Sequence, residues 1–314
     1  MRIFSTLQEV TEIFPTPILT MGNFDGVHFG HQHIFQLVRE RAQQTQGTSI
    51  VLTFDPHPQK ILFPERKFFL INHMQEKIEI LGHIGIDVLI CMKFTRAFSQ
   101  QDPEDFVREV LVNILHIYEI YIGYDSRFGQ NHQGTPESLI RWGQIYGFGV
   151  TIIPPISKDG IVVSSTKIRQ LIREGMVEEA GRLLNRPYAL DGHVVPGVQR
   201  GSTLLGYPTA NMEILHELIP KQGVYICQAL WKEHFYPAIV NIGTNPTFHG
   251  HQTTIEAHLL DFHNHLYGER LKIVFLKRIR DEISFPDHKA LATRITQDVR
   301  IAKAYFAHQE SCST

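Results

Sequence analysis

The stretch at residues 20–31 constrains the fold most, and it reads Thr-Met-Gly-Asn-Phe-Asp-Gly-Val-His-Phe-Gly-His. The apolar run at 17–20 predicts a buried strand before it, and helical spacing of apolar residues over 34–42 predicts a helix after it. Its glycines let the backbone approach a ligand, and a helix N-terminus offers N–H groups to anions. His28 and His31 can donate hydrogen bonds to phosphate oxygens. The stretch therefore predicts a nucleoside triphosphate site. A plain turn with surface histidines is the alternative, and the further glycines argue against it.

Composition restricts the class of protein. The chain is 43% hydrophobic with a formal net charge of −2, which gives no electrostatic reason for a nucleic-acid or membrane-surface partner. Cys91, Cys227 and Cys312 form no C-x-x-C pair, and no apolar run reaches transmembrane length. We therefore expect a cytoplasmic protein that acts on small molecules, with no nucleic-acid and no membrane partner. A homo-oligomer is left open.

Apolar runs alternate with amphipathic segments through the first half of the chain, which favours a parallel sheet covered on both faces. Ligands of such sheets bind at the carboxyl ends of the strands. The segments 22–31, 55–58 and 123–134 follow predicted strands, so we expect them to converge on one crevice. The further predicted strands are at 49–54, 88–91, 117–122 and 150–153, and the further helices at 74–81, 103–115 and 136–146.

A second anion-binding element is predicted at residues 163–169, which read Val-Ser-Ser-Thr-Lys-Ile-Arg and open a helix. Lys167 and Arg169 place positive charge at the positive end of that helix, which costs a few tenths of a kcal/mol unless an anion neutralises them. An ordinary helix cap at Ser165 or Thr166 is the alternative.

These motifs resemble those of the H-x-G-H nucleotidyltransferases. The G-N-F-D-G-x-H-x-G-H form is similar to the adenylyltransferase half of the bacterial bifunctional riboflavin kinase/FMN adenylyltransferase (FAD synthetase) family. The resemblance implies a Rossmann-like α/β nucleotidyltransferase domain over residues 1–186, in which His28 and His31 stabilise charge on the triphosphate. It implies flavin contacts from Pro56, Pro58 and Phe128. It implies ATP contacts from Gly22, Asn23, Phe24, Asp25, His28, His31, Asp125, Ser165, Thr166 and Arg169.

The pattern changes near residue 186 to short β-type runs separated by glycine and proline turns. These predict an antiparallel sheet or small barrel. Strands are expected at 192–195, 224–227, 237–241, 254–259 and 271–276, and a closing amphipathic helix at 288–307.

This second half resembles the riboflavin kinase module through the segments 206–211 (G-Y-P-T-A-N), 241–248 and 256–262. The resemblance implies a Greek-key β-barrel over residues 187–314 and makes Glu256 the general base that deprotonates the flavin alcohol. Thr209 and Asn211 can present oxygens to one side, which suits Mg²⁺ held with ATP. An ordinary turn is the alternative for that segment alone. The implied ATP and Mg²⁺ contacts of the kinase are Gly206, Pro208, Thr209 and Asn211, with Thr209 and Asn211 as metal ligands.

Together the two halves predict an enzyme that makes FAD from riboflavin, with ATP, riboflavin and FMN as small-molecule substrates and Mg²⁺ accompanying ATP. Two alternatives stay open. Ser202 and Asn245 stand where basic residues are usual, so the kinase half could be impaired and only the adenylyltransferase active. The chain could also be a flavin-binding protein without catalysis.

Overall fold

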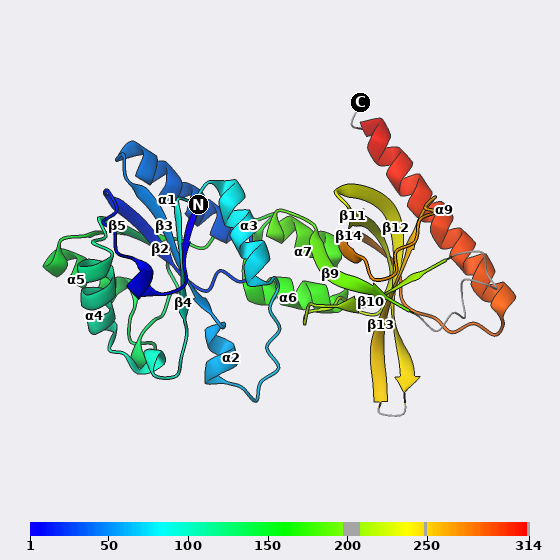
Figure 1. Cartoon of the computed structure of the whole chain (residues 1–314), viewed down its shortest axis with the longest axis horizontal. Coiled ribbons are helices and arrows are strands. Elements are labelled where there is room, and N and C mark those ends of the chain that lie inside the picture. Colours follow the sequence, from blue (N-terminus) through cyan, green and yellow to red (C-terminus); the bar gives the residue numbers. More distant parts are fainter. Residues whose placement is uncertain (197–207, 248–249, 313–314) are drawn as a thin grey trace. The chain divides into compact units, whose positions relative to one another are not determined.

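The structure is a computed structural model, and it describes residues 1–196, 208–247 and 250–312 (Figure 1). Its internal contacts divide the chain into two compact units, Met1–Ser165 and Thr166–Thr314. This division reflects compactness; the functional boundary near residue 186 stays a prediction. No helix of the described residues has the length and apolar character needed to cross a membrane.

The first unit contains a six-stranded parallel sheet in the order β1-β4-β3-β2-β5-β6. Helices α1 (Phe29–Gln44), α2 (Pro58–Leu62), α3 (Met74–Ile84), α4 (Pro103–Phe106) and α5 (Pro136–Tyr146) join its strands. A short hairpin of β7 (Ser157–Lys158) and β8 (Ile161–Val162) follows. The strands are β1 (Arg2–Phe4), β2 (Pro17–Met21), β3 (Thr48–Asp55), β4 (Val88–Lys93), β5 (Glu119–Gly123) and β6 (Gly149–Ile153).

Alternate residues of β2 face opposite layers of helices. Ile18 packs with Ile34 and Val38 of α1, whereas Leu19 packs in a cluster with Phe106 and Leu139 of the other layer. The expected parallel sheet covered on both faces is therefore confirmed. The helix expected over 103–115 is α4 continued by a π-helix at Val107–Ile114, where the Leu115 N–H donates to the Val110 carbonyl five residues earlier, at 3.0 Å.

The second unit is a closed barrel with the strand order β10-β13-β12-β11-β14-β9, in which all neighbours are antiparallel. The hairpin-connected strands β11, β12 and β13 with β10 beside β13 make a Greek key, as expected. The helices are α6 (Ser165–Glu174), α7 (Val177–Leu184) and α9 (His288–Cys312). The strands are β9 (Tyr188–Val195), β10 (Ala210–Ile214), β11 (Gly223–Trp231), β12 (His234–Thr247), β13 (Gly250–Leu259) and β14 (Arg270–Arg280).

Two apolar layers hold this unit together. Tyr225, Cys227 and Phe275 are fully buried within the barrel. On its outer surface, Val224 and Ile226 of β11 pack against Ala302 of α9. The closing helix predicted from its apolar spacing therefore covers one side of the barrel.

Candidate functional sites

The three segments expected to converge in the first unit follow β2, β3 and β5, which are neighbours in the sheet. Since the strands are parallel, all three segments lie at the same edge. This is the topological arrangement that places a ligand site at the carboxyl ends of the strands.

The loop between β2 and α1 has an unusual backbone that its surroundings fix. Phe24, Gly26 and Val27 have φ of 46°, 82° and 40°, and a positive φ at the β-branched Val27 is strained. The Gly26 N–H donates to Asn72 Oδ1 at 2.7 Å, and the Ile71 N–H donates to the Asp25 carboxylate at 3.1 Å. The buried Asp25 side chain and the Gly26 N–H thus attach the loop to residues 71 and 72.

His28 and His31 are brought together by the start of α1. His28 caps the helix, because its Nδ1 accepts from the His31 N–H at 3.3 Å. The two rings stack with centroids 3.5 Å apart and planes 19° from parallel. A Cβ on Gly30 would lie 3.3 Å from the His28 ring, so the glycine of H-x-G-H leaves the space in which this ring sits. The cap bond also places the proton of a neutral His28 on Nε2.

His31 lies in an environment that opposes a positive charge. The pKa of His31 is lowered well below its ordinary value, mainly by burial and to a lesser extent by the neighbouring His28 and by Lys77. Its Nδ1 is buried and, among the residues that the structure describes, has no hydrogen-bond partner. Phe24 packs edge-on against the His31 ring at 5.2 Å. A neutral, orphaned imidazole beside a helix N-terminus is suited to exchange a hydrogen bond with a ligand.

The second anion-binding element reaches the same loop through Ser165. The Ser165 hydroxyl donates to the Asp25 carbonyl at 2.9 Å, and Ser165 is the first residue of α6. Thr166 is exposed and Arg169 is half-buried; both belong to the second unit. Gly22 and Asn23, the other backbone positions of the predicted ATP site, lie in the loop after β2.

The remaining residues predicted for the first site lie in the segments that follow β3 and β5. Pro56 and Pro58 are half-buried, and Asp125 is exposed to solvent. The Phe128 ring packs against Phe106 at 5.8 Å and Trp142 at 6.3 Å, so much of its surface belongs to the core. Their contacts with nucleotide or flavin stay predictions.

Lys77 of α3 is a charged residue of this region that sequence reasoning missed. It is 6% exposed, and its Nζ donates to the Asn23 carbonyl at 2.7 Å and to Thr53 Oγ1 at 3.3 Å. Helical spacing could have indicated that Lys77 is buried. Lys77 precedes the core residue Leu81 by one helical turn and so lies on the apolar face of the predicted helix.

In the second unit, Glu256 of β13 stands between two asparagines. The register pairs it with Asn211 of β10 on one side and with Asn241 of β12 on the other. Directly paired residues of adjacent strands point to the same face of a sheet, so the three side chains form one polar row. Asn211 and Glu256 are predicted site residues, whereas the sequence alone indicates no individual role for Asn241.

The row opens into a cavity of about 330 Å³ between the barrel and α9. Burial, then the neighbouring Glu282, raise the pKa of Glu256 above its ordinary value. The ion pair between Arg280 of β14 and the buried Asp298 of α9, at 2.8 Å, forms part of the wall. Residues that line the cavity include Thr209, Asn241, Glu256, His258, Glu282, Phe285, Leu291 and Ile295.

Pro208, two residues before β10, is tied to β13 by a hydrogen bond. The His258 ring Nδ1 donates to the Pro208 carbonyl at 2.8 Å. His258 lies two residues after Glu256 on the same strand, so this bond holds the Pro208–Thr209 backbone near the polar row. Gly206, also predicted to contact ATP, lies outside the described residues, as does Ser202.

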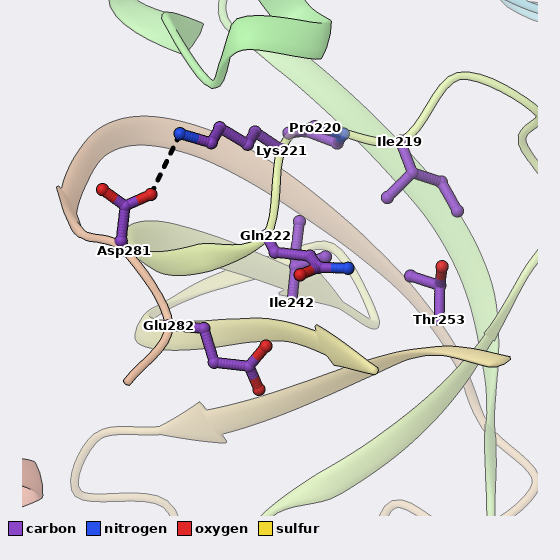
Figure 2. A pocket seen from close by; sticks show the side chains of 8 residues that line it. All are labelled: Ile219, Pro220, Lys221, Gln222, Ile242, Thr253, Asp281 and Glu282. Atoms are coloured by element: carbon purple, nitrogen blue, oxygen red, sulfur yellow. Dashed lines mark ion pairs between the residues drawn. The ribbon is translucent and has the colours of Figure 1, made fainter. Parts of the chain in front are cut away.

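A second cavity, of about 410 Å³, shares Glu282 with the first (Figure 2). Figure 2 shows Lys221 paired with Asp281 at its rim, at 3.0 Å, and Ile242 among its lining residues. A Cβ on Gly243 would overlap a carboxylate oxygen of Glu282, so the glycine of the 241–248 segment makes room for this side chain.

Comparisons with known proteins cover both units. A family model described as FAD synthetase matches residues 11–167, and one described as riboflavin kinase matches residues 184–306. A bifunctional riboflavin kinase/FMN adenylyltransferase of Buchnera aphidicola is 35% identical and covers 98% of each chain. One from Escherichia coli is 33% identical over 92% of each chain. A solved structure from Streptococcus pneumoniae, described as a macrolide-efflux protein, has a TM-score of 0.88 at 30% identity and covers 96% of this chain and 98% of its own.

Proposed function

The chain belongs to the bifunctional riboflavin kinase/FMN adenylyltransferase family, and we propose that the residues described above carry its two reactions. The enzyme phosphorylates riboflavin to FMN and then joins FMN to the AMP part of a second ATP, with release of pyrophosphate. Riboflavin, FMN and FAD are thus its flavin substrates and products.

We assign the adenylyl transfer to the loop between β2 and α1. The phosphate of FMN is itself the nucleophile, so the protein needs no nucleophile and contributes mainly by positioning and by stabilising charge. The observation that best supports this assignment is the stacked His28–His31 pair at the start of α1, where N–H groups and the helix dipole favour an anion. Ser165, Thr166 and Arg169 are proposed to bind the triphosphate with them.

We assign riboflavin phosphorylation to the polar row of β10, β13 and β12. Glu256 is the proposed base, since a half-buried carboxylate with a raised pKa accepts a proton more readily near neutral pH. The cavity beside it, with its aromatic and aliphatic lining, is the proposed riboflavin site. The adjoining cavity that shares Glu282 is our candidate for the nucleotide.

Mg²⁺ is the metal proposed to accompany ATP in the kinase. Thr209 lines the cavity and Asn211 stands beside Glu256, so their oxygens are hard ligands of the kind that Mg²⁺ prefers. Thr209 and Asn211 would hold the ion, which neutralises phosphate charge when bound. A cytoplasmic location without nucleic-acid or membrane partners is part of the same proposal.

One product analysis tests the two assignments together. The protein is incubated with Mg-ATP and either riboflavin or FMN, and the flavins are separated by chromatography. We expect FMN and then FAD from riboflavin, and FAD from FMN. FAD from FMN without any FMN from riboflavin would instead support the impaired kinase, and flavin binding without turnover would support the non-catalytic alternative.

A further inference from the structure

The buried Lys77 has no part in the function proposed so far. A lysine that is 6% exposed must have its charge compensated, because removing an ammonium group from water is costly. Burial lowers the pKa of Lys77, and the charges of Asp25, Cys91 and Asp55 oppose that effect. These groups come from the loop after β2 and from strands β3 and β4, at the edge of the sheet where the ligand site is proposed.

The hydrogen bonds of Lys77 connect the loop between β2 and α1 to strand β3. Its Nζ joins the Asn23 carbonyl, at 2.7 Å, to Thr53 Oγ1 of β3, at 3.3 Å. The Thr53 hydroxyl also reaches the Asn23 carbonyl, at 3.3 Å. Asn23 directly precedes Phe24, whose positive φ begins the strained part of the loop. Lys77 therefore fixes the point at which the loop leaves the strand.

The same ammonium group acts on the imidazole pair. Two positive rings stacked 3.5 Å apart would repel each other, so the stack is compatible with at most one charged ring. After burial and His28, Lys77 is the remaining group that lowers the pKa of His31. A fixed positive charge at Lys77 thus favours a neutral His31 and the stacked geometry.

We propose that Lys77 is a positioning residue of the adenylyltransferase site, whose ammonium group ties the β2–α1 loop to β3 and repels a second positive charge from His31. This inference rests on the proposed role of the His28–His31 pair. Lys77 acts through Asn23 and His31 and is not assigned a contact with substrate.

Lys77→Met tests the proposal in the full chain, because it keeps much of the side-chain volume and removes the charge. We expect kcat/KM for FAD formation from FMN to fall about tenfold at pH 7.5, as the loop loosens. The acid side of its pH profile should move to higher pH, because His31 is then protonated more easily. Lys77→Arg, which keeps the positive charge, should leave the pH profile in place. Riboflavin phosphorylation by the same preparations should not change, which reports that the barrel is intact.

Lys93→Met is the matched control, since Lys93 is exposed at the end of β4 and should change neither rate nor profile. Thr53→Val removes the hydroxyl that bonds to Lys77 and to the Asn23 carbonyl but leaves the charge of Lys77. It should therefore lower the rate of FAD formation without moving its pH profile. An unmoved pH profile in Lys77→Met, whatever its rate, would reduce Lys77 to a structural residue and overturn the electrostatic part of the proposal.

NMR titration separates this proposal from the one on which it rests, and it needs no activity. With labelled histidine and lysine in the wild-type protein, Lys77 should be charged at pH 7 and His31 should titrate well below a free histidine. A neutral Lys77 at pH 7 would overturn the proposal even if Lys77→Met fails to fold. His31 titrating at higher pH in Lys77→Met, with no matching change in adenylylation, would support the charge effect and refute the catalytic role of His31.

Discussion

The His28 and His31 rings stack with centroids 3.5 Å apart, and the first residue caps the helix on which the second lies. The cap bond and the stack fix both rings relative to the N-terminus of α1. A helix N-terminus alone attracts many anions, whereas two positioned imidazoles add donors at defined places. The two histidines therefore give a physical reason why this turn would support adenylyl transfer in addition to binding the triphosphate.

Replacement of both histidines by alanine should abolish FAD formation while FMN still accumulates from riboflavin. The physical reason is the loss of the groups proposed to stabilise the triphosphate, with the barrel left unchanged. Flavin chromatography after incubation with riboflavin and Mg-ATP measures both products. His33→Ala is the control on the same helix, since His33 is exposed. Normal FAD formation by the double variant would remove the pair from the mechanism.

Gly30→Ala should lower adenylylation without lowering stability. An alanine Cβ would lie 3.3 Å from the His28 ring, which must shift by a few tenths of an ångström. We expect roughly a tenfold lower kcat/KM for FAD formation. The free energy of unfolding should not fall, because alanine favours helix over glycine by about 1 kcal/mol.

Gly82→Ala provides the comparison for that experiment. Gly82 lies in α3 with no heavy atom within 4 Å of an added Cβ, so the substitution should raise stability by about 0.5–1 kcal/mol and leave both activities unchanged. Equal activity of the two alanine variants would show that the His28 ring position does not matter.

Glu256→Gln should block FMN formation from riboflavin and spare conversion of FMN to FAD. Glutamine keeps the size of the side chain but cannot take the proton of the flavin alcohol. Because the pKa of Glu256 is raised, wild-type kinase activity should fall with decreasing pH before an ordinary glutamate would be protonated. Initial rates of FMN formation across pH measure both effects. Glu213→Gln, at an exposed residue of the neighbouring β10 that lines neither cavity, should behave as wild type.

The sequence predicted the parts of the sites that depend on local pattern. Residues 22–28 lie between β2 and α1, and the change of apolar period across the motif predicted this strand-to-helix turn. Ser165 reaches the Asp25 carbonyl of the first motif, and this contact brings the second predicted element to the same loop. Glu256 is the one carboxylate in the mostly apolar run 255–260, which marked it before its neighbours were known.

The missed residues depend on register and on long-range packing. Asn241 stands beside Glu256 only because the β12–β13 hairpin pairs those two positions, and local periodicity does not determine that pairing. Glu282 enters both cavities because Gly243 leaves room for it on another strand. His258 belongs to the 256–262 segment that resembles the kinase module, but its bond to Pro208 depends on the long-range pairing of strands in the closed barrel.

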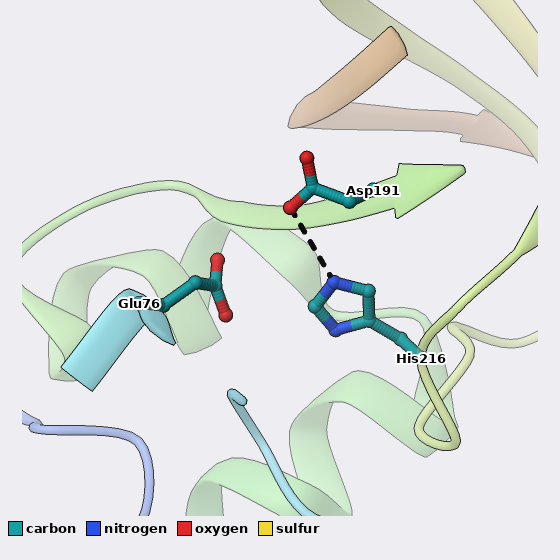
Figure 3. Close-up of side chains that lie close together, drawn as sticks. All are labelled: Glu76, Asp191 and His216. Carbon is teal, nitrogen blue, oxygen red and sulfur yellow. Dashed lines mark ion pairs between the residues drawn. The ribbon is translucent and has the colours of Figure 1, made fainter. Parts of the chain in front are cut away.

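The barrel contains a polar contact outside the proposed sites, between Asp191 of β9 and His216 (Figure 3). The Asp191 carboxylate lies 3.6 Å from His216 Nε2 and 3.4 Å from Arg270 Nη2, and Asp191 is 9% exposed. Burial alone would raise the pKa of Asp191, but His216, Lys272 and Arg270 together lower it below its ordinary value. A carboxylate with a depressed pKa stabilises the fold above the pKa of its unfolded form, about 3.9, and loses that contribution as pH falls through the folded value.

Asp191→Asn should therefore destabilise the barrel by roughly 1–3 kcal/mol near pH 7, because it removes the charge that His216 and Arg270 face. The difference from wild type should begin to shrink as the pH falls below the unfolded pKa of about 3.9, and it should disappear once the pH has passed the lower pKa of the folded carboxyl. The difference in the free energy of unfolding is measured by urea titration in a Trp142→Phe background. That background leaves Trp231 of β11 as the fluorescence reporter of the barrel. Asp261→Asn is the control, since its ion pair with Lys303 is exposed and screened by solvent and should contribute little to stability. A loss of stability that does not depend on pH would mean that Asp191 acts through packing and that its charge contributes nothing.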